Sequence, residues 1–120
     1  MVQANELRIG NKILGIAAGI LITVDMHFFN ECYDDDTMLD WYMPITLTED
    51  VLVNCGFEKV KSDYGPAETD DYTLGILYFD MANQSTKISG KYCLSFIPES
   101  LHQLQNLYFA LTGSELIVNF

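Results

Sequence analysis

Four side chains near the C-terminal end of this 120-residue chain have the residue types and spacing of a binding surface. His102, Gln105, Asn106 and Phe109 occupy positions i, i+3, i+4 and i+7. If the segment is helical, each residue advances by about 100° and these four share one face. An imidazole and two carboxamides offer directional hydrogen bonds, and the aromatic ring adds apolar area. The pattern therefore predicts partner-binding residues for another protein.

The same four residues have a second interpretation inside the molecule. Phe109 would fill a second core layer, and the amide groups would satisfy backbone groups of neighbouring loops. The sequence leaves both alternatives open, because it does not show what covers this face.

The helix that must carry these residues is well marked. Five apolar residues fall within an arc of roughly 120° and form a core-facing stripe. They are Leu101, Leu104, Leu107, Tyr108 and Leu111. Ser100 precedes this stripe and Gly113, a favoured C-terminal cap, follows it, so we predict one long helix between them.

The possible metal ligands do not match a known site. Asp34, Asp35 and Asp36 invite a calcium interpretation, but an EF-hand loop starting at Asp34 needs glycine and glutamate where Leu39 and Ile45 stand. Only one histidine and one cysteine, His27 and Cys32, lie within reach of a zinc ion there. We therefore expect a solvated acidic loop, no metal and no cofactor.

Nucleophilic catalysis has no sequence signature either. The chain contains no Gly-x-Ser-x-Gly elbow, no phosphate-binding loop and no dinucleotide fingerprint. A cysteine hydrolase would need one of the three cysteines to approach His27 or His102. These cysteines are Cys32, Cys55 and Cys93. Their odd number and wide spacing favour free thiols in a reducing compartment, and we expect a protein that is not an enzyme.

The charge balance restricts the partners. Acidic residues number 17 against 6 basic ones, which gives a formal net charge of -11. Direct binding to DNA or RNA is disfavoured, because it draws on a basic surface. Two interpretations of the acidity remain: a surface that serves solubility, or an acidic decoy that imitates nucleic acid and occupies a basic partner.

The N-terminal apolar run resembles a secretory leader but favours a hairpin. Arg8 and Lys12 precede the run 13–24, which is too short to span a bilayer and is followed by no small-residue cleavage site. Gly15 and Gly19 instead indicate strand, turn and strand, over 7–16 and 20–29. We therefore expect a cytoplasmic protein that does not associate with membranes.

The remaining segments complete an α+β pattern. Thr46 to Glu49 has the form of a capping box, which predicts a short helix through Cys55 that stops at Gly56. Further strands are expected over 38–43, 57–61, 72–80, 91–97 and 115–120. The order favours a twisted antiparallel sheet, in which an N-terminal SH3-like half barrel is joined by a second sheet layer, with one short and one long helix. We expect a single compact domain over 1–120.

Three stretches carry a resemblance to a known family. They are Asn5 to Asn11 (NELRIGN), Pro44 to Glu49 with Gly56-Phe57, and His102 to Gly113 (HQLQNLYFALTG). Together they resemble a family of small uncharacterised proteins from gut bacteria and their phages, and this chain departs from the family at Lys12 and in the acidic loop. The family has no assigned activity, so the resemblance implies relatedness and a phage or mobile-element setting but transfers no catalytic residue. It is compatible with a non-catalytic interaction or accessory module.

Overall fold

The described part of the chain forms two compact units. The computed structural model describes residues 2, 4–17, 19–35, 37–61, 68–80, 85–88, 92–94 and 98–119. Unit 1 comprises Met1–Leu47 and Pro98–Leu116, and unit 2 comprises Thr48–Ile97 and Ile117–Phe120. The expectation of a single domain over 1–120 stays a prediction.

Unit 1 contains a three-stranded antiparallel sheet in the order β2-β1-β3. Strands β1 (Lys12–Gly15) and β2 (Leu21–Thr23) form an antiparallel pair with Ile13 opposite Ile22. Both are shorter than the strands predicted over 7–16 and 20–29. Gly19 has φ 61° in the turn, a backbone conformation that glycine adopts without steric cost. The central strand β1 also pairs with β3 (Tyr42–Met43).

The second predicted strand is wrong beyond Thr23, because the chain forms a helix there. Helix α1 spans Met26–Asp34, and Asp25 caps its N-terminus by accepting a hydrogen bond from the Phe28 backbone N–H. The aromatic pair Phe28-Phe29 favours a strand locally, yet Phe28 lies in the core of unit 1, and Cys32, about one helical turn later, packs against that core. Helical packing therefore prevails over local strand propensity.

The segment 38–43 is only partly a strand. A 3-10 helix, η2 (Met38–Trp41), leads into the short strand β3. We expected the first three strands to follow one another and to form an SH3-like half barrel. In the structure α1 and η2 lie between β2 and β3. The core beneath them includes Val2, Ile13, Val24 and Phe28, and Tyr42 packs edge-on against the Phe28 ring at 5.1 Å between centroids.

The predicted long helix is confirmed as α3 (Leu101–Thr112). Ser100 stands at its N-cap, and Gly113 ends it with φ 73°. Leu101 and Leu104 are buried, whereas Leu107, Tyr108 and Leu111 are half-buried. Within unit 1, α3 packs against β1.

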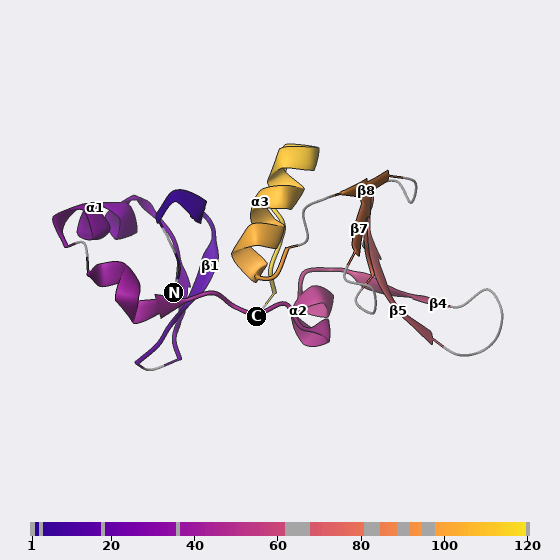
Figure 1. Cartoon of the computed structure of the whole chain (residues 1–120), viewed down its shortest axis with the longest axis horizontal. Helices are drawn as coiled ribbons and strands as arrows, with labels where there is room; N and C mark the ends of the chain where they lie inside the picture. The colour runs from indigo at the N-terminus through magenta and orange to yellow at the C-terminus, as the bar shows by residue number, and fades with distance from the viewer. Residues whose placement is uncertain are drawn as a thin grey trace. The chain divides into compact units, whose positions relative to one another are not determined.

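Unit 2 combines one short helix with a five-stranded antiparallel sheet (Figure 1). Helix α2 (Glu49–Asn54) is capped by Thr48, whose hydroxyl accepts from the Val51 N–H, and Gly56 follows with φ 91°. The capping residue is thus two positions later than the predicted Thr46. The sheet follows chain order in five strands: β4 (Glu58–Lys61), β5 (Glu68–Leu74), β6 (Leu77–Asp80), β7 (Ser85–Ile88) and β8 (Tyr92–Leu94).

Two strand predictions in the second half of the chain need correction. The expected strand over 72–80 is two strands, because Gly75 turns the chain with φ 58° and places Leu74 opposite Leu77. The expected strand over 115–120 is absent in 115–119, and none of the described strands pairs with this segment. Residue 120 lies outside the described residues. The α+β class, two antiparallel sheets and one long helix are confirmed.

No helix within the described ranges has the length and apolarity to span a membrane.

Candidate functional site

The carboxamide of Gln105 binds the backbone that enters β1. Its Oε1 accepts a hydrogen bond from the Lys12 N–H at 2.8 Å, and its Nε2 donates to the Gly10 carbonyl at 3.1 Å. Only 2% of Gln105 is exposed. Because the packing of α3 against β1 brings these groups together, the side chain satisfies backbone that would otherwise be buried without partners.

Asn106 extends the same arrangement by one residue. Its Oδ1 accepts from Arg8 Nε at 3.1 Å and from Asn11 Nδ2 at 2.9 Å, and its Nδ2 donates to the Glu6 carbonyl at 2.9 Å. Together, Gln105 and Asn106 fasten the segment 6–12 to α3. This is the internal role that the second interpretation of these residues predicted.

Phe109 lies at the outer end of the face and is 39% exposed. The Arg8 guanidinium stacks over its ring at 4.4 Å from the centroid, a cation–π contact, and forms an ion pair with Glu115. Arg8 therefore covers part of the ring that we predicted for a partner.

The structure thus places the four predicted partner-binding residues in different environments. His102 and Gln105 are buried, Asn106 is half-buried, and only Phe109 retains substantial exposed area. Contact of these residues with a partner stays a prediction, and in this conformation Phe109 alone offers surface for it.

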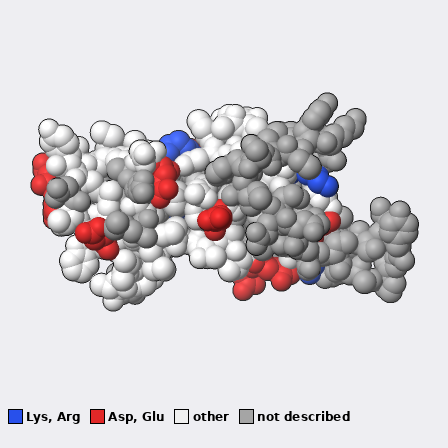
Figure 2. Space-filling model, in the orientation of Figure 1, with Lys and Arg blue, Asp and Glu red and all other residues white. Residues whose placement is uncertain are grey.

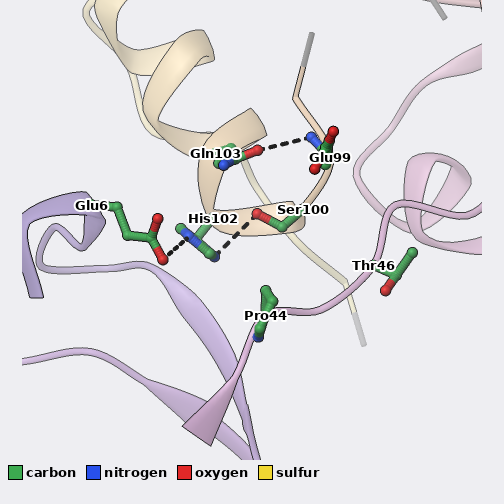
Figure 3. A pocket seen from close by; sticks show the side chains of 7 residues that line it. All are labelled: Glu6, Pro44, Thr46, Glu99, Ser100, His102 and Gln103. Carbon is green, nitrogen blue, oxygen red and sulfur yellow. Dashed lines mark hydrogen bonds and ion pairs between the residues drawn. The ribbon is translucent and has the colours of Figure 1, made fainter. Parts of the chain in front are cut away.

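His102 lines a pocket of about 360 Å³ at the start of α3 (Figure 3). Its Nδ1 lies 3.3 Å from Ser100 Oγ, and its Nε2 lies 3.5 Å from Glu6 Oε1. The backbone bond from the Leu101 N–H to the Ile45 carbonyl, 2.8 Å long, and the bridge between Thr46 and Ser100 fix the start of the helix beside the chain that leaves β3. The remaining wall is formed by Pro44, Thr46, Glu99 and Gln103.

Burial keeps His102 neutral at pH 7. The ring is 1% exposed, and desolvation lowers the pKa of His102, while the Glu6 carboxylate acts in the opposite direction. The Nε2 atom lies within ion-pair distance of Glu6 but makes no hydrogen bond of good geometry, so we regard this contact as a weak electrostatic one. The direction of the Ser100–His102 hydrogen bond depends on the tautomer of the ring. In the tautomer whose hydrogen lies on Nε2, Nδ1 accepts from the Ser100 hydroxyl and the Nε2 hydrogen faces Glu6.

A second, apolar groove lies at the β1–β2 hairpin. It has a volume of about 270 Å³ and is lined by Gly15, Ile16, Ala17, Ile20, Ile22, Trp41 and Tyr42. The Ile16 N–H donates to the Trp41 carbonyl at 2.9 Å, which fixes the end of η2 beside the hairpin turn. We name the exposed side chains of Ile16, Ile20 and Trp41 the hairpin patch; they are 53%, 57% and 61% exposed.

Sequence reasoning missed the hairpin patch because it assigned Ile16 and Ile20 to sheet strands. The available signal was two isoleucines flanking a glycine turn, where side chains extend past the paired residues. Trp41 gave no such signal, because its position next to the turn depends on η2.

The candidate metal and thiol residues do not gather. Among the described residues, no cluster of three histidine, cysteine or acidic side chains has the arrangement of a metal site. His27 pairs with Glu31 at 2.7 Å, and Asp35 accepts from the N–H and hydroxyl of Thr37. Asp36 and the side chain of Cys93 lie outside the described part.

Cys32 and Cys55 are free thiols, and neither is activated. Burial raises the pKa of Cys55 to about 11. Partial burial, with the Glu31 and Asp35 carboxylates nearby, raises the pKa of Cys32. Both remain thiols at neutral pH, which makes them poor nucleophiles.

Comparison with known proteins identifies no relative: no family model, no curated protein sequence and no solved structure matches this chain.

Proposed function

We propose that this protein is a non-catalytic, protein-binding module of a bacterial or phage system, that it acts in the cytoplasm, and that it docks its partner on the hairpin patch. The observation that carries the proposal is the exposure of Ile16, Ile20 and Trp41 around an apolar groove. Exposed apolar groups that gather on one surface are typical of interaction sites.

The energetics of the patch support docking. Burying a large apolar side chain fully contributes on the order of 1.5–3 kcal/mol, and tryptophan is enriched among the residues that dominate binding energy. Ile16 and Ile20 are held by the hairpin, whose backbone bond from the Gly15 N–H to the Ile20 carbonyl is 2.8 Å long. A partner would therefore meet a surface that needs little ordering.

The hairpin patch suits this role better than the α3 face. The amide groups of Gln105 and Asn106 already hold the segment 6–12, so a partner that recruited them would have to break existing hydrogen bonds. When a partner binds the hairpin patch, the side chains of Ile16, Ile20 and Trp41 lose only their contact with water.

The experiment combines partner capture with a built-in probe. Trp41 is the only tryptophan of the chain, so its fluorescence reports on the patch directly. We expect binding of a captured host protein to shift the Trp41 emission to shorter wavelength. The I20E variant should lose both the capture and the shift. The matched control is I117E, because Ile117 is 73% exposed and lies in unit 2. Capture that survives I20E, or binding without a change in Trp41 emission, contradicts the proposal.

The alternative function is the acidic decoy, and the charge of unit 1 favours it. Unit 1 contains nine acidic residues (Glu6, Asp25, Glu31, Asp34, Asp35, Asp36, Asp40, Glu99, Glu115) against Arg8 and Lys12. On the viewed face in Figure 2 the acidic side chains of the described residues form separate patches and no continuous track, so the alternative is supported by the amount of charge and not by its arrangement. A decoy must displace nucleic acid from its partner, so a ternary complex of captured partner, DNA or RNA and this protein would exclude it.

A further inference from the structure

The pocket at the start of α3 brings a hydroxyl, an imidazole and a carboxylate into one chain of contacts. We propose that Ser100 is a nucleophile that accepts an acyl group from a small, uncharged ester, with His102 as its base and Glu6 as a positioning residue. This inference replaces the non-catalytic part of the proposed function. It leaves the proposed docking on the hairpin patch unaffected, because the hairpin patch shares no residue with this pocket.

Ser100 is in an unusual state for a helix-capping residue. Its backbone has the extended conformation of an N-cap, with φ −133° and ψ 161°, but its side chain makes no capping hydrogen bond. The hydroxyl instead lies 3.3 Å from His102 Nδ1. Serine is favoured at this position because it caps, so directing the hydroxyl to the imidazole gives up a stabilising contact.

His102 has the protonation state that a base requires. Desolvation lowers its pKa, so the buried ring is neutral and its Nδ1 lone pair can take the Ser100 proton. The resulting imidazolium would face Glu6, whose Oε1 lies 3.5 Å from Nε2 (Figure 3). The carboxylate therefore stabilises the charge that the reaction creates, as the third member of a hydrolytic triad does.

The helix itself provides the remaining electrostatic element. Because the Ser100 side chain does not cap α3, it leaves the N–H groups of the first helical turn uncovered by a hydroxyl. The positive end of the helix dipole lies at this turn and stabilises negative charge that develops on an acyl oxygen. The Leu101 N–H is excluded from this role, since it donates to the Ile45 carbonyl.

The reaction step follows from these positions. Ser100 Oγ forms a bond to the ester carbonyl carbon while its proton moves to His102 Nδ1. The bond from that carbon to the leaving oxygen then breaks, and His102 returns the proton to the alcohol that departs. Water repeats the same two transfers to release the acid. A pocket of about 360 Å³, lined by Glu6 and Glu99, suits a small neutral acyl group and disfavours an anionic one.

The experiment uses p-nitrophenyl acetate on the wild-type full chain, followed by acid quenching and mass spectrometry of tryptic peptides. Cleavage after Lys91 leaves Ser100 and the exposed Ser114 on one peptide, so Ser114 serves as an internal control. We expect acetylation at Ser100 to exceed that at Ser114 by on the order of 100-fold, the contribution of a positioned base. The preference must disappear in urea, where the pocket is lost. No adduct on Ser100, or equal labelling of both serines, overturns the proposal.

A variant of Glu6 separates positioning from mere structural support. E6Q removes the carboxylate charge but retains its size, so the midpoint of the acylation rate against pH should move to lower pH, because the imidazolium loses its stabilising neighbour. A purely structural Glu6 would change the rate without moving the midpoint. An unmoved midpoint therefore overturns the role assigned to Glu6.

Discussion

Gln105 and Asn106 show at the residue scale why the candidate site was only partly predictable. The spacing of the sequence placed both on one face of a helix, and that placement holds in α3. Whether the face meets water or protein depends on the segment 6–12, which is about a hundred residues away in the chain and donates or accepts most of their hydrogen bonds. Helical periodicity contains no information about that distant neighbour.

The buried carboxamide of Gln105 gives the first stability prediction. In Q105A the Lys12 N–H and the Gly10 carbonyl lose their partner, so we expect the free energy of unfolding to fall by about 1–3 kcal/mol. Urea denaturation followed by circular dichroism measures the change. Q103A is the matched control, because the Gln103 carboxamide accepts only an exposed bond from the Glu99 N–H and its loss should cost no more than about 0.5 kcal/mol. Equal losses in both variants would contradict the internal role of Gln105.

His102 gives a prediction on pH. Its folded pKa is lowered by burial below the ordinary value of 6.5, so at acidic pH the unfolded chain binds a proton more readily than the folded one. The stabilising contribution of the neutral ring is complete above about pH 6.5 and declines as pH falls from there through the folded pKa. Denaturation at several pH values should therefore show a steeper acid decline in the wild type than in H102N.

The matched control for this test is the other histidine of the chain. His27 is exposed on α1 and pairs with Glu31, so H27N removes a histidine without altering the buried pocket. If H27N flattens the pH dependence as much as H102N does, the assignment to His102 is wrong.

At the scale of elements, the sequence predicted a helix or turn best where the residues that begin and end it act locally. Helix α3 and the β1–β2 turn have their boundaries at Ser100, Gly113 and Gly19, and each of these residues acts within a few positions of itself. Helix α1 was not predicted, because the aromatic pair at 28–29 has strand propensity, although Asp25 caps a helix there. The strand predicted over 115–119 was wrong because an alternating pattern forms a strand only where a neighbouring strand supplies the hydrogen bonds, and none of the described strands pairs with this segment.

Helix α2 allows a direct test of which threonine caps it. Thr48 accepts a hydrogen bond from the Val51 N–H, so T48A should lower the stability of unit 2 by about 1 kcal/mol. The capping-box pattern instead indicated Thr46, whose side chain is exposed, and T46A should change stability by less than about 0.5 kcal/mol. Hydrogen exchange of the α2 amides measures both variants. If T46A destabilises α2 more than T48A does, Thr46 is the capping residue, as the sequence pattern indicated.

At the scale of the whole molecule, net charge is the property that the sequence determines most directly. The 17 acidic and 6 basic side chains give a formal charge of -11, whatever fold the chain adopts. Self-repulsion of this kind opposes compact states and is screened by salt. Two of the six basic residues are already engaged within their own unit, since Arg8 pairs with Glu115 and Lys59 with Glu49. The acidic excess is therefore left to the surface, where ions can reach it.

We expect added sodium chloride to stabilise this protein. Raising the salt concentration from about 0.01 M to about 0.15 M shortens the Debye length from about 30 Å to about 8 Å, which screens repulsion between distant carboxylates. The melting temperature should rise over this range, and the rise should be smaller in the double variant D34N/D40N, whose formal charge is -11 + 2 = -9. Both aspartates are exposed, so the substitutions leave the core unchanged. A melting temperature that falls with salt would mean that attractive ion pairs, such as that of Arg8 with Glu115, outweigh the repulsion.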